Sequence, residues 1–463
     1  MRALEDLRDA DFGDKRLTRR LLKVVEGLAP DPSASFPDAA QTDASLEGTY
    51  RFLNNEAVTP AAILAPHVAA TVKRVREAGL AIVAHDTTEL SFSTDREGAG
   101  PMDDGGRGFF AHFSLAIRAD GSRRPLGVVG LRTFVRSDVR RRSHRTHLWP
   151  EEERESFRWK VAAKEVGALF PVDRVVHVMD SEADFFALLQ LLVDEKRRFV
   201  IRLKYNRTVA EDAESPRRLD QKLEEKLDGL EGRLTREVTL ASRTTRVAAR
   251  KQTRRNATRQ SRIAKLEFTA TAVFLRAPDY LGPAPRLPVH VVHVREPNPP
   301  ANCEPVDWKL ITTEPIENAA DIERIVDIYR ARWVIEEFFK ALKTGCGIEK
   351  RQLESVPALH NALAILAPIA WELLLLRSLA RDDAHLPATE AFSPTKLQVL
   401  QRHKNTRLRR DASVRDAMLA VARLGGHITN NGEPGWLVLG RGYERLLVYE
   451  EGMLLAGKDL INP

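Results

Sequence analysis

The sequence predicts an α/β protein, in which a mixed sheet with flanking helices carries a β-rich insertion and lies between helical N- and C-terminal domains. Apolar residues recur at helical spacing in residues 1–70 and again in about the last hundred residues. Between these regions, short apolar runs begin with a hairpin signal and then alternate with helical patterns, which is typical of a mixed sheet. The chain has 463 residues, enough for two to four domains at roughly 100–200 residues each.

The composition is that of a folded, mildly basic protein. Hydrophobic residues make up 43% of the chain and charged residues 30%, which excludes a disordered chain. Lys and Arg number 72 against 65 Asp and Glu, and the resulting net charge of +7 favours a polyanionic partner. Cys303 and Cys346 are too few for a disulfide framework or a four-cysteine zinc site and fit a reducing cytoplasm.

No segment predicts secretion or a membrane span. The N-terminal segment lacks the apolar core of a signal peptide. The most apolar stretch, residues 362–376, is about 15 residues long and contains Pro368 and Glu372, whereas a spanning helix needs about 20. We therefore expect a buried helix there and a cytoplasmic protein.

Residues 1–70 are expected to form the first helical domain. Residues 14–29 place apolar side chains at helical spacing with Lys and Arg around them, and the Pro- and Ser-rich residues 30–37 end that helix. Thr42 or Asp43 is suited to cap a second helix, and Thr59, directly before Pro60, a third.

Residues 71–372 are expected to hold the sheet. The apolar run 80–84 ends at His85-Asp86, and the runs 109–117 and 126–135 are joined by a hairpin signal, Asp120-Gly121. The run 175–179 ends at Asp180, and 199–203 is a further strand. Strand patterns dominate from about 207 to 314 and predict the β-rich insertion. Helical patterns resume at Asn318, and residues 373–463 form the last helical domain.

Asp86 and Asp180 each follow a predicted strand. Side chains at the carboxyl ends of strands in such a sheet converge on ligands. Aspartate is also favoured in ordinary turns, so this placement alone leaves a turn role open.

The segment 325–343 predicts a helix with two distinct faces. At 100° per residue, one arc of about 80° collects polar side chains and the opposite side is apolar. A solvated face with a Glu336–Lys340 pair is the alternative interpretation. The polar arc consists of Tyr329, Arg332, Glu336, Lys340 and Lys343, and the apolar side of Val334, Ile335, Phe338, Phe339 and Leu342.

These residue types suit chemistry on phosphodiesters. Two or three carboxylates can hold two Mg²⁺ ions through oxygen ligands, and Mn²⁺ can substitute. Two such ions about 3.5–4 Å apart stabilise the attacking and leaving oxygens of a displacement at phosphorus. Arg, Lys and Tyr beside the carboxylates would bind phosphate oxygens. The pattern therefore predicts phosphodiester cleavage or strand transfer.

Three sequence blocks carry a family resemblance. HDTTELSFS at 85–93, VMDSEADFF at 178–186 and YRARWVIEEFFKALKTG at 329–345 resemble the DDE transposases of the insertion-sequence-4 family. The last block has that family's Tyr-(2)-Arg-(3)-Glu-(6)-Lys signature, and FGDKRLTRRL at 12–21, LEGTYRFLNN at 46–55 and VARLGGHI at 421–428 extend the likeness. The resemblance implies an RNase H-like catalytic domain, a DNA-end-binding domain at 1–70 and dimerisation through 373–463.

The resemblance also implies roles for individual residues. Asp86, Asp180 and Glu336 match the catalytic, metal-binding triad. Tyr329, Arg332 and Lys343 match the phosphate contacts of the signature, with Lys340 on the same predicted helix face, and Arg202 resembles an arginine near the cleaved strand. Trp308 resembles a tryptophan that stacks on a flipped base, although an aromatic there could equally belong to the core.

Two basic stretches add possible phosphate contacts. Residues 243–265 contain nine Lys or Arg and no acid, and we expect Arg250, Lys251, Arg254 and Arg255 to contact DNA unless the stretch is a solvated loop. Residues 136–145 form a second stretch. His144 and His147 have a spacing that allows zinc, but no third ligand supports it. The absence of a phosphate-binding P-loop motif predicts no nucleotide cofactor.

The predicted function is Mg²⁺-dependent cut-and-paste transposition in the bacterial cytoplasm. The protein would bind the terminal repeats of its element as a homodimer on double-stranded DNA, cleave by way of a hairpin and join the ends to target DNA. A nuclease without strand transfer and a non-catalytic DNA-binding inhibitor or domesticated derivative are the alternatives. An intact set of three carboxylates argues against the non-catalytic alternative.

Overall fold

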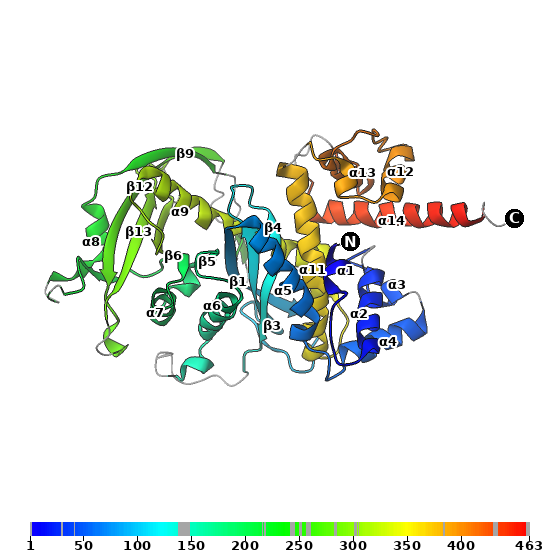
Figure 1. The fold of residues 1–463 in the computed structure, drawn as a ribbon, viewed down its shortest axis with the longest axis horizontal. Helices are drawn as coiled ribbons and strands as arrows, with labels where there is room; N and C mark the ends of the chain where they lie inside the picture. Colours follow the sequence, from blue (N-terminus) through cyan, green and yellow to red (C-terminus); the bar gives the residue numbers. More distant parts are fainter. Residues whose placement is uncertain are drawn as a thin grey trace. The chain divides into compact units, whose positions relative to one another are not determined.

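The structure is a computed structural model of the chain, and it divides into two compact units. It describes residues 2–459 apart from 29–30, 41, 138–148, 215, 217–218, 241–245, 250–251, 256–260, 282–284, 301–302, 304, 383–384 and 429–433. Unit 1 comprises residues 1–151 and 333–463, and unit 2 comprises residues 152–332. Figure 1 shows the elements of both units.

Unit 1 begins with five helices, two of which start directly after the predicted capping residues. They are α1 (Arg2–Leu7), α2 (Lys15–Leu28), α3 (Phe36–Ala40), α4 (Asp43–Leu53) and α5 (Pro60–Ala78). The Thr42 side chain accepts a hydrogen bond from the Ser45 amide, and Thr59 does the same for Ala62, so both predicted caps are confirmed. Leu21, Val24, Val25 and Leu28 bury one face of α2, while Lys15, Arg16, Arg19 and Lys23 are exposed on the other.

A buried polar network joins α1 to the sheet of unit 1. Asp6 Oδ2 lies 2.7 Å from His67 Nδ1, and the Arg74 guanidinium bonds both oxygens of Asp6. His67 Nε2 accepts from the Val128 amide at 3.0 Å. Burial lowers the pKa of His67, so the ring is neutral near pH 7 and its Nδ1 carries the proton donated to Asp6.

The sheet of unit 1 is antiparallel. Strands β2 (Gly100–Pro101) and β1 (Ala81–Phe92) both pair with β3 (Arg107–Arg118), and β4 (Pro125–Phe134) pairs with β3 through the expected hairpin. Helices α5 and α11 (Val356–Asp382) pack against β4. The prediction that the first strand ends at His85-Asp86 is wrong, because the strand continues to Phe92 and places Asp86 at its middle.

Helix α11 is the buried helix expected from its apolar sequence. Its span Val356–Arg381 is long and apolar enough to cross a membrane, with a mean hydropathy of 1.8, but 78% of its most apolar window is buried inside the protein. This burial identifies a core helix. Glu372 of α11 accepts hydrogen bonds from the amides of Arg2 and Ala3, at 3.1 and 3.0 Å, and so caps α1.

Unit 1 ends in a helical region packed on α11. It contains α12 (Pro394–Arg402), α13 (Val414–Leu424) and α14 (Trp436–Asp459), and α13 packs against both α11 and α14. Ser413 caps α13 by accepting from the Asp416 amide, and the Asp416 carboxylate accepts in return from Ser413.

Unit 2 contains a mixed sheet, as predicted. The strand order is β5 (Val175–Met179), β6 (Arg198–Arg202), β14 (Asp307–Thr312), β13 (Leu287–Arg295), β12 (Arg262–Leu275), β7 (Thr208–Ala210) and β8 (Gln221–Lys222). Strands β5 and β6 are parallel and the later pairs antiparallel, with β9 (Leu234–Leu240) also pairing with β12. Strands dominate residues 207–314, and α6 (Phe157–Leu169), α7 (Phe186–Asp194), α8 (Leu223–Asp228) and α9 (Ala319–Ala331) complete the unit.

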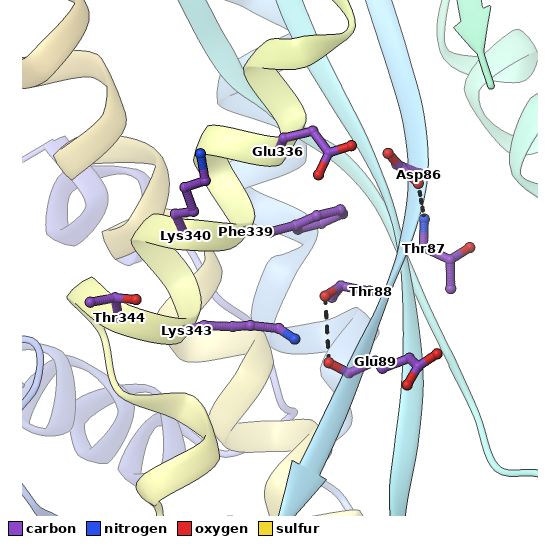
Figure 2. A pocket seen from close by; sticks show the side chains of 9 residues that line it. All are labelled: Asp86, Thr87, Thr88, Glu89, Glu336, Phe339, Lys340, Lys343 and Thr344. Carbon is purple, nitrogen blue, oxygen red and sulfur yellow. Dashed lines mark hydrogen bonds between the residues drawn. The ribbon is translucent and has the colours of Figure 1, made fainter. Parts of the chain in front are cut away.

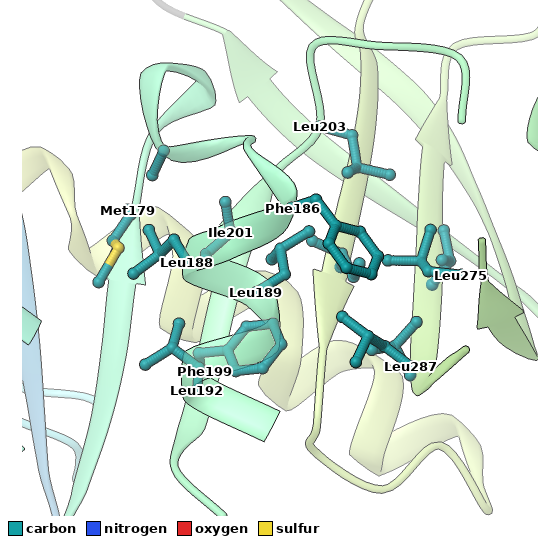
Figure 3. Packing of buried hydrophobic residues seen from close by; sticks show 14 of the residues in the cluster. Met179, Phe186, Leu188, Leu189, Leu192, Phe199, Ile201, Leu203, Leu275 and Leu287 are labelled. Carbon is teal, nitrogen blue, oxygen red and sulfur yellow. The ribbon is translucent and has the colours of Figure 1, made fainter. Parts of the chain in front are cut away.

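The core of unit 2 explains the position of β5. Side chains of α7 fill one face of the sheet against residues of β5, β6, β12 and β13 (Figure 3). Met179, the last residue of β5, and Ile201 beside it are fully buried. This packing holds the end of β5, and therefore the residue that follows it, in a defined place.

Candidate active site

A pocket of about 350 Å³ in unit 1 brings together residues of β1 and of the segment 336–344. Asp86 and Glu336 point toward each other across it, and Lys343 points toward Thr88 (Figure 2). The pocket is lined by Asp86, Thr87, Thr88, Glu89, Glu336, Phe339, Lys340, Lys343 and Thr344. Two of the three predicted triad carboxylates therefore share one cavity with two lysines.

Aromatic packing sets Glu336 opposite Asp86. In the register of β1 with β3, Asp86 pairs with Phe113. The Phe113 ring lies 5.1 Å from that of Phe338 and 6.0 Å from that of Phe339, both on the buried side of α10 (Trp333–Lys340). Because Glu336 precedes these phenylalanines by less than one turn, their burial holds its carboxylate over β1. The apolar side predicted for this helix is confirmed for Ile335, Phe338, Phe339 and Leu342.

Asp86 and Lys343 are both held by local contacts. Asp86 is 9% exposed, and its Oδ1 accepts from the Thr87 amide at 2.8 Å. Lys343 Nζ lies 3.3 Å from Glu349 Oε1, and the same oxygen accepts from the Ser91 amide of β1 at 3.3 Å. Glu349 thus ties the lysine of the signature to the strand that carries Asp86.

The third carboxylate of the pocket, Glu89, differs chemically from the other two. Burial and its hydrogen bond with Asp103 raise the pKa of Glu89, while a hydrogen bond from Arg136 holds the pKa of Asp103 below its usual value. Glu89 and Asp103 therefore share a proton more readily than two separate carboxylates would. Sequence reasoning missed Glu89, although it lies within the block that contains Asp86.

The predicted single helix over 325–343 is wrong. Helix α9 ends at Ala331, α10 begins at Trp333, and residues Ala341–Gly345 form a π-helical turn. The Arg332 amide donates to Tyr329 O, three residues back, which tightens the chain at this point. The alternative of a solvated polar face is wrong for Tyr329 and Arg332, which are only 3% and 6% exposed.

Unit 2 holds the remaining predicted site residues in one neighbourhood. Asp180 follows β5 directly, as predicted, and its Oδ1 accepts from the Glu182 amide at 2.9 Å. Arg202 ends the neighbouring strand β6. Burial raises the pKa of Tyr329, while the charges of Arg332 and Arg202 oppose that rise and the charge of Asp180 adds to it. All three charged groups therefore lie close enough to act on the Tyr329 hydroxyl.

Trp308 is half-buried on β14 and contacts Tyr329. The two rings meet edge to face with their centroids 5.7 Å apart. The tryptophan is thus neither a fully buried core residue nor remote from the signature, and part of its surface remains accessible.

Among the described residues, no group of three or more His, Cys, Asp or Glu side chains is arranged to hold a metal ion. Asp86 and Glu336 belong to unit 1 and Asp180 to unit 2. Burial raises the pKa of the Cys346 thiol to about 12, so this cysteine is not a nucleophile at neutral pH.

The principal basic stretch falls partly outside the residues that the structure describes. Outside the described residues lie Arg250 and Lys251 of this stretch, and so does the separate pair His144 and His147. Arg254 and Arg255 lie in β11 (Gln252–Arg255), which pairs with β10 (Arg246–Ala249) as a hairpin. The contact of these residues with DNA stays a prediction.

Glu337, next to Glu336, joins three helices of unit 1, which are α10, α11 and α14. Its Oε1 accepts from Lys340 at 2.6 Å, and its Oε2 accepts from Arg377 of α11 at 2.7 Å and from the Trp436 indole of α14 at 3.3 Å. Burial acts to raise the pKa of Glu337, but the Lys340 hydrogen bond and the charges of Lys340 and Arg377 outweigh it, so the pKa is lowered.

We expect Glu337→Gln to lower the free energy of unfolding at pH 7 by about 1–2 kcal/mol, because two cations lose their carboxylate. A carboxyl whose pKa is lowered by folding stabilises above its unfolded value, near 4.5, and loses this contribution as the pH falls through the folded value. The difference from wild type should therefore shrink below pH 4.5. Urea unfolding followed by tryptophan fluorescence measures it, with the exposed Glu77→Gln as control. Equal stability at pH 7 would remove Glu337 from this role.

Comparison with known protein families gives two domain matches along the chain. The family model described as Transposase DNA-binding matches residues 3–58, and the one described as Transposase DDE domain matches residues 153–371. The second range includes Asp180 and Glu336, whereas Asp86 precedes it. Among solved structures, the chain is similar to a piggyBac transposase synaptic complex with hairpin DNA, with 12% identity, a TM-score of 0.36 and coverage of 80% of this chain and 67% of that chain. On these two matches, the chain combines a transposase DNA-binding domain with a transposase DDE domain, which supports a transposase.

Proposed function

We propose that the protein is a cut-and-paste transposase of the insertion-sequence-4 family, resembling the transposon-5 transposase, with an RNase H-like catalytic core. The observation that carries the proposal is the pocket in which Asp86 faces Glu336, with Lys343 pointing toward the same strand and Lys340 also lining the cavity. Carboxylates set next to ammonium groups suit a substrate that needs both a metal ligand and a phosphate contact.

The donor set suits Mg²⁺. Asp86 and Glu336 offer carboxylate oxygens inside the pocket, Thr88 adds a hydroxyl, and neither His nor Cys lines it. Hard oxygen ligands of this kind favour Mg²⁺ or Mn²⁺ over zinc. Asp86, Glu336 and Asp180 would hold two Mg²⁺ ions, which when bound supply stabilisation of the attacking and leaving oxygens at phosphorus.

The chain's own residues would hold the DNA during the reaction. Tyr329, Arg332, Lys340 and Lys343 bind phosphate oxygens, and Arg202 lies near the cleaved strand. In the first step a water oxygen forms a bond to phosphorus and the bond to the 3′-oxygen breaks, leaving a 3′-hydroxyl. That hydroxyl then attacks a phosphorus of the opposite strand, and the bond from this phosphorus to the 3′-oxygen of the flanking DNA breaks, which forms a hairpin while Trp308 stacks on an extruded base. A second water attacks the hairpin phosphorus and releases the 3′-hydroxyl. That hydroxyl attacks a phosphorus of the target DNA and displaces its 3′-oxygen.

We also propose the division of labour along the chain. Residues 1–70 bind the ends of the element, residues 71–372 carry the chemistry, and residues 373–463 form a homodimer in the synaptic complex. The protein acts on DNA in the bacterial cytoplasm. Terminal inverted repeats in the DNA flanking the gene would be its binding sites.

A product assay tests the proposed function. The purified protein is incubated with Mg²⁺ and a duplex that carries the flanking repeat, and denaturing gels separate nicked, hairpin and joined products. We expect all three in that order. Nicked products alone would establish the nuclease alternative, and binding without any product would establish the non-catalytic one.

A further inference from the structure

The turn between α12 and α13 presents a dense group of positive charges. Residues 402–410, here called the 402–410 loop, contain five Lys or Arg and no Asp or Glu. All five side chains are exposed, and they are Arg402, Lys404, Arg407, Arg409 and Arg410. The loop lies outside both family matches, at residues 3–58 and 153–371.

The loop is fixed to the helices rather than extended into solvent. The buried Thr406 hydroxyl donates to Leu400 O at 2.6 Å, and the Leu408 amide donates to the same carbonyl at 3.0 Å. The Arg407 amide donates to His403 O at 3.1 Å. These bonds hold the backbone in one conformation while the cationic side chains point outward.

Arg407 adopts a backbone conformation that is unfavourable for an arginine. Its φ is +43°, in the left-handed region where glycine or asparagine is preferred. A residue held in this region is a reason to look for a function of its side chain. An exposed guanidinium at a strained position is consistent with selection for its charge.

The charges of the loop are poorly compensated. Among the described residues, Arg409 alone of the five forms an ion pair, with Asp411 at 3.7 Å, and both of those side chains are mostly exposed. Such a pair screens little charge. Five cations within nine residues repel one another unless a polyanion lies against them.

We propose that the 402–410 loop is a second DNA contact, which binds the phosphate backbone of duplex DNA without reading its sequence. DNA is the polyanion that this chain meets, because the chain carries a transposase DNA-binding domain. The side chains are exposed along a turn whose backbone is fixed by hydrogen bonds, which suits contacts to phosphates rather than to base edges inside a groove. The contact does not depend on strand cleavage.

The test compares two double variants that remove equal charge. Lys404→Gln/Arg410→Gln alters the loop, and Lys73→Gln/Arg76→Gln removes two exposed charges of α5. Fluorescence anisotropy gives the affinity of each full-length protein for a labelled duplex between 50 and 300 mM KCl. Each lost phosphate contact should make the slope of log K against log salt less steep by about 0.9. It should also weaken binding by about five- to tenfold near 0.1 M salt.

We expect the loop variant to lose one to two units of slope, by about equal amounts on the flanking-repeat duplex and an unrelated duplex, and the α5 variant to keep the wild-type slope. An unchanged slope in the loop variant, or an equal loss in both variants, would overturn the proposal. An acidic protein partner for the loop would show as the first of these outcomes.

Arg407→Gly guards against a folding defect. Glycine accepts the left-handed conformation, so this variant removes one charge without destabilising the turn. It should keep the wild-type melting temperature or exceed it, and lower the salt slope by about 0.9. A stable Arg407→Gly protein with the wild-type slope would count against the proposal even if the double variant failed to fold. Retained metal-dependent cleavage in this variant separates its outcome from that of the proposed function.

Discussion

Asp86→Asn, Asp180→Asn and Glu336→Gln should each lower metal-dependent strand cleavage by about 1,000-fold or more while leaving DNA binding nearly unchanged. A metal ion supplies several kcal/mol of stabilisation to the transition state, and each 1.36 kcal/mol is a factor of ten in rate. The amide substitutions keep the shape of the side chains and, at Asp86, an oxygen that can accept from the Thr87 amide. The loss would therefore report on charge and metal ligation rather than on folding.

Quench-flow or gel kinetics of first-strand nicking provide the measurement. Glu77→Gln, which removes an exposed carboxylate of α5, is the matched control and should cleave at the wild-type rate. A variant that nicks within tenfold of wild type would exclude its residue from the metal site. Weakened DNA binding that accounts for the whole loss would assign the residue to substrate binding instead.

Trp308→Ala should slow hairpin formation about 5- to 150-fold more than it slows first-strand nicking. The half-buried indole stands edge to face with Tyr329, and hairpin formation is the step that requires a base outside the stack. Base stacking on an aromatic contributes about 1–3 kcal/mol, which corresponds to this range of rates.

Trp308→Phe separates stacking from packing, since it keeps an aromatic ring and should restore much of the hairpin rate. Both steps are followed on one gel from a single labelled duplex. If alanine slows both steps equally, or lowers the melting temperature so far that the protein is unfolded at the assay temperature, Trp308 belongs to the core rather than to the DNA contact.

The elements set by local chemistry could be predicted from the sequence. Thr42 and Thr59 mark helix starts because their side chains satisfy free amides, and the turn Asp120-Gly121 joins two apolar runs into a hairpin. Asp180 directly follows an apolar run of five fully buried residues, and the strand ends with that run. The mixed sheet and the helical N- and C-terminal regions could be predicted from the spacing of apolar residues along the chain.

The position of Asp86 shows where this reasoning fails. The apolar run ends before Asp86, but the alternation of buried and partly exposed residues continues through Leu90 to Phe92, with β-branched threonines between. A polar residue after an apolar run is easily taken for the end of the strand when its partner on the adjacent strand is unknown. The partner of Asp86 is Phe113 of β3. Period-two alternation after the aspartate was the available signal.

The residues that support the pocket could not be found from spacing. Glu337 meets Arg377 and Trp436, which lie 40 and 99 positions further along the chain. Glu349 meets Ser91 across 258 positions. The break at Arg332 likewise depends on a local hydrogen bond that no helical wheel represents. Such contacts exist only after the chain has folded.

We propose that Asp86, Asp180 and Glu336 together hold two divalent metal ions. A Mn²⁺ titration followed by electron paramagnetic resonance, on the protein bound to the flanking-repeat duplex, tests it without reference to activity. We expect two bound Mn²⁺ ions per subunit for wild type and the loss of both from the Asp86→Asn/Asp180→Asn/Glu336→Gln variant, with Glu77→Gln unchanged. Equal Mn²⁺ binding by wild type and a folded, DNA-binding triple variant would contradict it.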